Sequence, residues 1–246
     1  MCQYLMRQEE YVEGTTVVVV LGSGVYEVVG SCEVPGMFGT TTYQKMLSVP
    51  FNNLSFVGKG EGETIVHGGF VVEKGRKISV KGLTMKNTSG FGVFASGVGT
   101  EMVLENVTVE ECQYHGVCVR DGAKFDATGC QFHQNGDCGV RVTGSATTAR
   151  LTNCTSHHNK WDGVCASSGA VVNLMGEGTS VHDNERHGLS AENCDHHQQE
   201  TTINVYQPCV LIHGVDYHSK IVSHGNKRQN IFMDFGGIVQ QKGSKK

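Results

Sequence analysis

Six side chains capable of acid–base, ionic or stacking chemistry occur one or two residues before a glycine that recurs along the chain. They are His115, Asp137, Trp161, Asp162, Arg186 and His187. A carboxylate next to an imidazole can act as an acid–base pair, and stacking of the repeats would bring Asp162 beside His187. Asp162, His187 and the neighbouring Arg186 are therefore the catalytic candidates that the sequence offers.

The same turns are also a candidate binding surface. Trp161 is the only tryptophan of the chain, and a tryptophan in a turn can stack on a sugar ring or anchor a partner protein. The predicted binding set is Trp161, Asp137, Asp162, Arg186, His187 and His115. The alternative interpretation is a solvated polar turn whose residues cap one another.

A second group of side chains is a candidate metal site. His133, His157 and His182 recur at one repeat position, and His224 extends the series. Imidazoles on adjacent strands lie about 4.8 Å apart and can share a transition metal. The alternative is a stack of surface imidazoles with lowered pKa values. No cofactor is expected.

An uncharged strip runs beside these histidines and is a further candidate surface. It is expected to face outward and could hold a glycan or an extended peptide, or be no more than a strand face. Its members are Thr84, Thr108, Gln131, Thr155 and Ser180.

The element that must position all these residues is a repeat. Glycine precedes an aliphatic residue at positions 92, 116, 139, 163 and 188, which gives intervals of 24, 23, 24 and 25 residues. A fixed period in this range is typical of a solenoid. With 33 glycines, 3 prolines and only 18% charged residues, the composition favours short strands joined by tight turns.

The residues after each glycine alternate as in a half-buried strand. The predicted inward column is Val93, Val117, Val140, Val164 and Leu189, and the residues expected to face outward are Phe94, Cys118, Arg141, Cys165 and Ser190. A second strand is expected to contribute another inward column, namely Ile78, Met102, Phe125, Ala149 and Leu174.

Four residues before each glycine, the sequence predicts a structural ladder. Its members are Thr88, Cys112, Asn135, Asn159 and Asn184. Asparagine tolerates left-handed backbone geometry, and its amide can bond to the equivalent asparagine of the next repeat. Residues 30–42 are predicted to form a loop. Cys130 and Cys154 are expected to lie one above the other as two core thiols.

The predicted organisation is an N-terminal cap over residues 1–14, a β-helix over residues 15–240 and a basic tail over residues 241–246. The net charge of −4 argues against a nucleic-acid partner, and no apolar run approaches the roughly 20 residues that cross a bilayer, which argues against a membrane. The N-terminus lacks the pattern of a secretory signal, so we expect the 10 cysteines to be mostly reduced, in the cytoplasm or nucleus.

Three segments carry a resemblance to a known family. They are residues 16–27 (TVVVVLGSGVYE), residues 54–60 (LSFVGKG) and residues 78–87 (ISVKGLTMKN), followed by the glycine repeats up to Leu189. Together these resemble the pectin-lyase-like superfamily, and in particular the repeats of carbohydrate-binding proteins, sugar hydrolases and certain F-box proteins. The resemblance implies an all-β, single-stranded, right-handed parallel β-helix.

Enzymes of that superfamily use acidic clusters that hold Ca²⁺, or paired carboxylates. The Asn-Thr-Asp, Asp-Asp, Gly-His-Gly and Arg-Ile-Lys motifs of polygalacturonases are absent, as is the Asp-Pro-His-Asp motif of alginate epimerases. The sequence therefore predicts a non-catalytic intracellular β-helix that acts as a protein-interaction or structural scaffold module. The alternative is a polysaccharide lyase, hydrolase or epimerase with a divergent site, or a carbohydrate-binding protein. The oligomeric state is left open.

Overall fold

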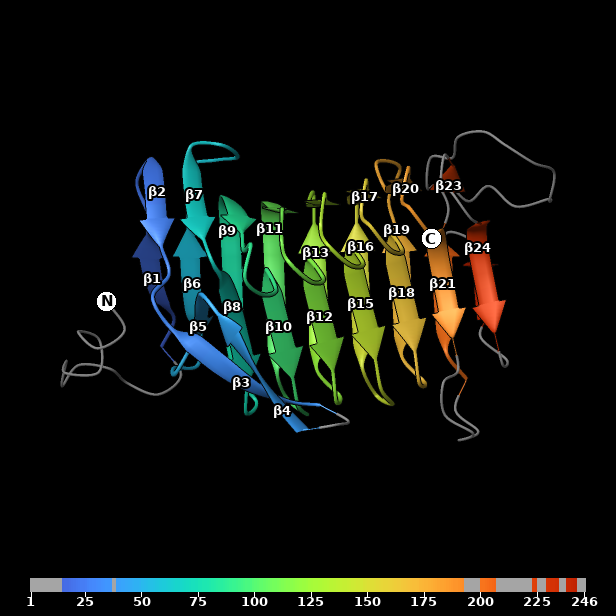
Figure 1. Cartoon of the computed structure of the whole chain (residues 1–246), viewed down its shortest axis with the longest axis horizontal. Helices are drawn as coiled ribbons and strands as arrows, with labels where there is room; N and C mark the ends of the chain where they lie inside the picture. Colours follow the sequence, from blue (N-terminus) through green and yellow to red (C-terminus); the bar gives the residue numbers. More distant parts are fainter. Residues whose placement is uncertain are drawn as a thin grey trace.

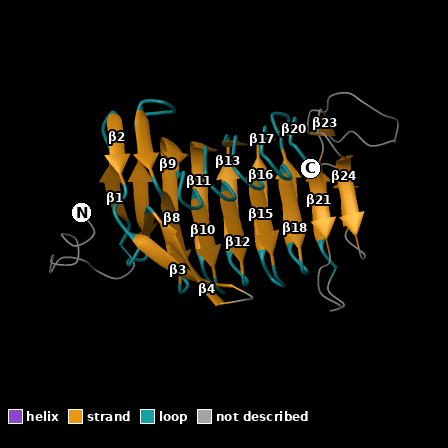
Figure 2. Cartoon of the chain, in the orientation of Figure 1, coloured by secondary structure: helices purple, strands orange, loops and turns teal. Residues whose placement is uncertain are grey.

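The computed structural model describes residues 15–36, 39–192, 200–206, 223–224, 229–234 and 238–242. The predicted cap at residues 1–14 and the end of the predicted tail, residues 243–246, lie outside the described residues. Within the described part, the chain consists of strands and turns, and it has no helix that could cross a membrane (Figure 2).

The strands stack side by side along one axis, as Figure 1 shows. In the described residues the larger sheet comprises β1 (Val17–Val20), β2 (Gly24–Glu27), β6 (Leu54–Val57), β7 (Thr64–His67), β9 (Lys77–Lys86), β11 (Glu101–Glu110), β13 (Lys124–Thr128), β14 (Gln131–His133), β16 (Thr148–Thr152), β17 (Thr155–His157), β19 (Val171–Met175), β20 (Ser180–His182), β22 (Thr202–Tyr206), β23 (Ser223–His224) and β25 (Ile238–Lys242).

A second sheet closes the other side of the solenoid. Its strands are β5 (Met46–Ser48), β8 (Gly69–Glu73), β10 (Val93–Ser96), β12 (Val117–Arg120), β15 (Val140–Thr143), β18 (Val164–Ser167), β21 (His187–Glu192) and β24 (Gln229–Asp234). All pairings in both sheets are parallel, so the predicted all-β parallel solenoid is confirmed.

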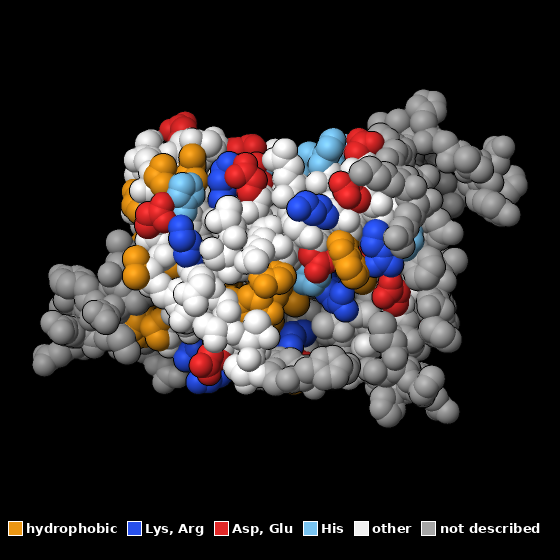
Figure 3. Space-filling model, viewed as in Figure 1, with side chains coloured by type: hydrophobic (Ala, Val, Ile, Leu, Met, Phe, Trp, Pro, Cys, Tyr) orange, Lys and Arg blue, Asp and Glu red, His pale blue; other side chains and the backbone are white. Residues whose placement is uncertain are grey.

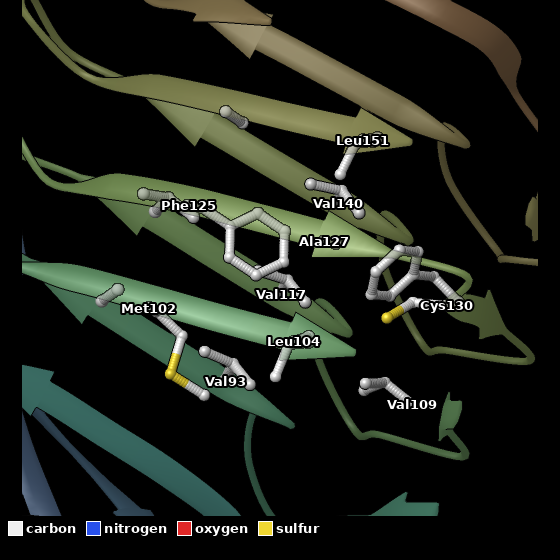
Figure 4. Packing of buried hydrophobic residues seen from close by; sticks show 14 of the residues in the cluster. Val93, Met102, Leu104, Val109, Val117, Phe125, Ala127, Cys130, Val140 and Leu151 are labelled. Atoms are coloured by element: carbon white, nitrogen blue, oxygen red, sulfur yellow. The ribbon is translucent and has the colours of Figure 1, made fainter. Parts of the chain in front are cut away.

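The predicted first inward column is confirmed. Val93 pairs with Val117, and the register continues through Val140 and Val164 to Leu189. Each of these five side chains is 0% exposed. Figure 4 shows three of them, Val93, Val117 and Val140, on the same side of the core as one another and facing side chains of the opposite sheet such as Phe125 and Leu151. Burial of this continuous apolar core is the main force that holds the rungs together.

The second inward column is correct up to Ala149 and wrong at its last member. Ala149 pairs with Val172, and Leu174 pairs with Leu151 instead. The reason lies in the turns, because the connection between β19 and β20 covers residues 176–179 whereas that between β16 and β17 covers only residues 153–154. A shift of two residues keeps Leu174 on the inward face, where it is buried.

The asparagine ladder explains the repeated glycine. Asn135, Asn159 and Asn184 are all 0% exposed, and their amides bond from rung to rung. A Cβ at Gly139 would lie 2.8 Å from Asn159 Nδ2 and 2.8 Å from the carbonyl oxygen of Gly163. Only glycine therefore fits where the ladder meets the next strand. Thr88 was predicted for this ladder, but it is exposed and Asn87 takes the buried place.

The prediction of a loop over residues 30–42 is wrong. β3 (Ser31–Gly36) and β4 (Gly39–Gln44) form an antiparallel hairpin, seen across the face of the second sheet in Figure 1. Val34 packs in a second apolar cluster with Phe91, Phe94 and Cys118, so Phe94 and Cys118 are buried although they point away from the main core. The predicted outward direction of both residues is confirmed, and they are buried because the hairpin covers this end of the sheet.

Candidate functional site

The turns before the repeated glycines form two ladders, and the outer one carries Trp161. Backbone amides join its members from rung to rung, with Trp161 N donating to Asp137 O at 3.3 Å and Arg186 N donating to Trp161 O at 3.1 Å. Trp161 is 44% exposed, and the Arg186 guanidinium carbon lies 4.6 Å from the centre of its indole ring. The expected neighbourhood of Asp137, Trp161 and Arg186 is thus present. The face seen in Figure 3 carries several separate hydrophobic patches, and charged and histidine side chains lie beside them.

The inner ladder is buried, unlike the solvated turn that the sequence left as an alternative. Its members are His115, Cys138, Asp162 and His187. Asp162 is 1% exposed, accepts a hydrogen bond from His187 N at 3.0 Å and lies 2.9 Å from His187 Nδ1. The predicted contact between Asp162 and His187 is therefore made. Both side chains are closed to a polymer substrate, and their role as an acid–base pair stays a prediction.

Burial sets the protonation behaviour of the inner ladder. It raises the pKa of Asp162, against the effect of the His187 backbone amide and the charges of Arg186 and His187. It also raises the pKa of Asp137. Burial, with the nearby charge of Arg141, lowers the pKa of His115 to about 3, so His115 is a neutral imidazole at neutral pH.

Two residues of this region were not part of the predicted site. Cys165 and Arg141 lie in the outward column of the strands that follow the turns, and Cys165 is nevertheless only 1% exposed. The sulfur atoms of Cys138 and Cys165 and a carboxylate oxygen of Asp162 all lie within 4.8 Å of one another. Cys138 and Cys165 are 27 residues apart, not one repeat, so the repeat spacing gave no signal of this contact.

The histidine column is a stack of parallel rings. The rings of His133 and His157 have centroids 4.8 Å apart, and those of His157 and His182 are 5.0 Å apart, with interplanar angles of 10° and 5°. Burial and the neighbouring imidazoles lower the pKa of His157 to about 4. Within the described residues, no three metal-ligand atoms gather on this column. The alternative of stacked imidazoles with lowered pKa accounts for this arrangement, and metal binding here stays a prediction.

The uncharged strip is partly covered rather than open. Thr84 and Thr108 are each 3% exposed. Gly62 N donates to Thr84 Oγ1 at 3.1 Å, and Gln131 Nε2 donates to Glu61 at 3.2 Å. The turn between β6 and β7 therefore folds over this strip. Thr155 and Ser180 lie farther along and are half-buried.

A groove that the sequence did not reveal runs along the outer face of β11, β13, β16 and β19. We call it the sheet groove. Its volume is about 400 Å³, and its outward-facing lining residues are Glu101, Val103, Lys124, Asp126, Thr148, Arg150 and Asn173. A smaller hollow of about 160 Å³ shares Glu101 and Val103 and extends toward β6. The depression is thus elongated along the solenoid axis.

Both acidic side chains of the sheet groove have a basic partner. Lys77 Nζ lies 3.0 Å from Glu101 Oε2, and Arg150 Nε lies 3.9 Å from Asp126 Oδ1. Beyond them, Asn204 Nδ2 donates to Asn173 Oδ1 at 3.0 Å. The available sequence signal was the charged alternation of Lys124, Asp126 and Arg150, which is also typical of any solvated strand face.

Comparison with solved structures finds proteins that are similar to this chain to different degrees. The pectate lyase Pel9A superposes with a TM-score of 0.52 at 15% identity, covering 79% of this chain and 55% of that one. The ORF18 protein of Geobacillus virus E2 gives a TM-score of 0.48 at 11% identity, covering 94% of this chain and 54% of that one. The A-module of the Azotobacter vinelandii mannuronan C-5 epimerase AlgE4 gives 0.33 at 15% identity, covering 94% and 89%.

This chain spans about half the length of the first two of these structures. At these identities the likeness concerns the fold alone. No curated protein sequence matches the chain.

The sequence itself matches a family model described as a right-handed β-helix region, over residues 52–204 and again over residues 91–245. Together with the parallel stacked rungs and the Pel9A superposition, this match confirms the predicted handedness and the pectin-lyase-like fold. The chain belongs to the family of right-handed parallel β-helix proteins.

Proposed function

We propose that this chain is a non-catalytic binding β-helix that holds an extended polysaccharide in the sheet groove. The observation that carries the proposal is the shape of the groove, which crosses four consecutive strands and continues toward β6. Ligands of repeating structure suit a surface of repeating rungs, because each rung can present similar groups to each sugar unit. The shared fold with a pectate lyase supports a polysaccharide as the ligand class.

The chemistry of the lining supports binding without turnover. Its carboxylates, Glu101 and Asp126, are on the exposed strand face and each has a cationic partner. A general acid in a glycosidase is instead a carboxyl group held in an apolar setting that raises its pKa. Hydroxyl, amide and paired ionic groups with the 38% exposed Val103 form a surface that can bond and pack against sugar rings.

A panel of neutral and acidic polysaccharides tests this proposal by affinity electrophoresis, with parallel assays for reducing ends and unsaturated uronates. We expect retardation by at least one polysaccharide and no product in either assay. Arg150→Glu should weaken the retardation about tenfold or more, because it places an unpaired acid beside Asp126. Lys59→Glu makes the same charge change on a turn that does not line the groove and should bind normally. Product formation, or no binding across the panel, would contradict the proposal.

Contact with a partner protein through Trp161 is a second candidate function. Trp161 is 44% exposed, whereas the Phe and Tyr side chains that the structure describes are buried or half-buried. An exposed tryptophan with an arginine stacked on it has the composition of an interface hot spot. Asp137 and Asp162 supply acidic neighbours, as the predicted binding set requires.

Intrinsic fluorescence separates the two candidates, because Trp161 is the only tryptophan of the chain. A polysaccharide in the sheet groove should leave its emission unchanged, since Trp161 does not line that groove. A protein that docks on Trp161 should shift the emission to the blue and lose about 2 kcal/mol or more of binding free energy with Trp161→Ala. An unchanged affinity of such a partner for Trp161→Ala would remove this candidate.

A further inference from the structure

Two groups of potential metal ligands meet at one buried thiol. The ligand atoms of Cys138, Asp162 and Cys165 lie within 4.8 Å of one another, and so do those of His115, Asp137 and Cys138. Cys138 belongs to both groups and is 0% exposed, while Cys165 and Asp162 are each 1% exposed. These residues come from turns and strands of adjacent rungs, which the parallel register holds in place.

We propose that Cys138, Cys165, Asp162 and His115 bind one thiophilic divalent metal ion, with Zn²⁺ as the ion that fits best. Two sulfurs with one nitrogen and one oxygen are a tetrahedral donor set typical of Zn²⁺. Ligand sulfurs of such a site lie about 3.8 Å apart, as follows from Zn–S bonds of about 2.3 Å. In the structure the ligand atoms of Cys138, Asp162 and Cys165 lie within 4.8 Å of one another, and His115 lies beside Cys138 in the second group.

The charges around the cluster balance those of a bound ion. Two thiolates and one carboxylate around a divalent cation leave one negative charge. Arg141 interacts electrostatically with both Cys138 and Cys165, and its guanidinium supplies the compensating positive charge. One further acidic and one further basic side chain border the site, since Asp137 lies 3.7 Å from the Cys138 sulfur and Arg186 lies 3.9 Å from Asp162. Pairing of opposite charges in this way lowers the cost of burying an ion.

Neighbouring groups orient two of the four ligands, His115 and Asp162. His115 Nδ1 accepts a hydrogen bond from Cys138 N at 3.2 Å, which places this nitrogen beside Cys138, and metal binding exchanges that bond for the bond to the ion. The imidazole is neutral, as a metal ligand must be. Asp162 is held by the backbone amide and ring of His187, in the way that outer residues orient metal-ligating carboxylates.

The chain contains a matched pair of thiols that lacks these features. Cys130 and Cys154 are also buried and lie on adjacent rungs, with their side chains in contact. They belong to neither ligand group, and Cys154 Sγ bonds to the carbonyl oxygen of Ala127 at 3.5 Å. Thiol proximity alone therefore does not define the proposed site, which depends on Asp162 and His115 being beside the thiols. None of its residues lines the sheet groove, so its test is independent of the proposed function.

Titration of the reduced, metal-free protein with Co²⁺ tests the site directly. We expect one equivalent of Co²⁺ to give a thiolate-to-cobalt charge-transfer band with the visible bands of tetrahedral cobalt, and Zn²⁺ to displace it. Binding should release the two thiol protons into a weakly buffered solution. Cys138→Ser and Cys165→Ser should each abolish the charge-transfer band or weaken Co²⁺ binding at least a hundredfold. Cys130→Ser should keep the band and bind Co²⁺ as tightly as the wild-type protein. Wild-type protein without the band, or full binding by Cys138→Ser, would overturn the proposal.

A second measurement keeps the test valid if a serine variant fails to fold. Zn²⁺ should raise the melting temperature of the reduced wild-type protein, because an ion that binds only the folded state stabilises it by mass action. Oxidation that joins Cys138 to Cys165 should remove this response. An unchanged melting temperature at saturating Zn²⁺ would refute the site, and so would an equal response before and after that oxidation.

Discussion

Nδ2 of Asn159 donates a hydrogen bond to Oδ1 of Asn184 at 2.9 Å, in the interior of the solenoid. Oδ1 of Asn159 in turn accepts from Nδ2 of Asn135 at 2.9 Å and from its backbone amide at 3.2 Å. Each asparagine thus bonds to the backbone and to the side chain of its neighbour. The ladder connects rungs inside the protein in the same direction as the strand pairing does at its surface.

Asn159→Ala should destabilise the protein far more than an ordinary surface substitution. The variant leaves two donors of Asn135 without an acceptor, at about 1–3 kcal/mol for each buried group. Urea unfolding measures the loss of free energy. Gln113→Ala, at an exposed position near the ladder, is the control and should change stability by less than about 0.5 kcal/mol. A similarly small change for Asn159→Ala would contradict the ladder's role.

Gly139→Ala should also destabilise, through overlap rather than through a lost bond. Its Cβ would collide with Ser156 Oγ and lie 2.8 Å from the Gly163 carbonyl oxygen. Overpacking of this kind costs about 1–3 kcal/mol or more. Gly22→Ala is the matched control, because a Cβ there meets its nearest atom, the Tyr26 hydroxyl oxygen, at 3.6 Å. Thermal melts of the two variants should therefore differ, and equal melting temperatures would rule the clash out.

Acidification should weaken the fold between about pH 6.5 and pH 4. The pKa of His157 falls from 6.5 to about 4 on folding because of burial and the adjacent imidazoles. In this window the unfolded chain binds more protons than the native protein, so the free energy of unfolding falls as the pH falls. The contribution of His157 to the free energy of unfolding is fully present above pH 6.5 and is lost as the pH falls through 4.

His157→Gln isolates this contribution. The slope of stability against pH should become shallower in the same window, while Gln113→Ala, which removes no titratable group, should keep the wild-type slope. Residual slope is expected in both variants, because the pKa of His115 is lowered to about 3. An unchanged slope for His157→Gln would show that the stacked rings titrate as they do in the unfolded chain.

Most of the 10 cysteines should react as free thiols when protein purified without reductant is denatured. All seven cysteines within the described residues are free, and they are Cys32, Cys112, Cys118, Cys130, Cys138, Cys154 and Cys165. Thiol titration in denaturant gives the number directly. A count showing most of them oxidised would place the protein in an oxidising, extracellular setting.

The repeat determined how much of the fold could be predicted. The spacing of glycines such as Gly139 and Gly163 follows from a steric requirement that returns once per rung, so it is visible in the sequence. The hairpin of β3 and β4 does not repeat, and its hydrophobic contacts with Phe94 and Cys118 join segments about 60 to 80 residues apart. Period-two alternation correctly places those two residues on the outward face, but it contains no information about an element that covers them.

In the candidate site, too, contacts between residues at the same repeat position could be predicted from the sequence, and the other contacts could not. The contact between Asp162 and His187 was predictable, since both residues occupy one repeat position. Their burial was not, because exposure in a turn depends on how the preceding residues, Trp161 and Arg186, stack outside them. The approach of Cys138 to Cys165 joins a turn position to a strand position. Such a contact has no spacing in the sequence that marks it.

The hairpin also makes the solenoid mechanically unequal along its length. Val34 lies in one cluster with Val71, Phe94 and Cys118, which belong to β8, β10 and β12. Those rungs are clamped together from outside, whereas β15 and β18 take no part in this cluster. A chain pulled from its ends should therefore lose the later rungs in small successive steps, and the clamped rungs should break together at a higher force. The hairpin gives the N-terminal part of the protein the behaviour of a single block.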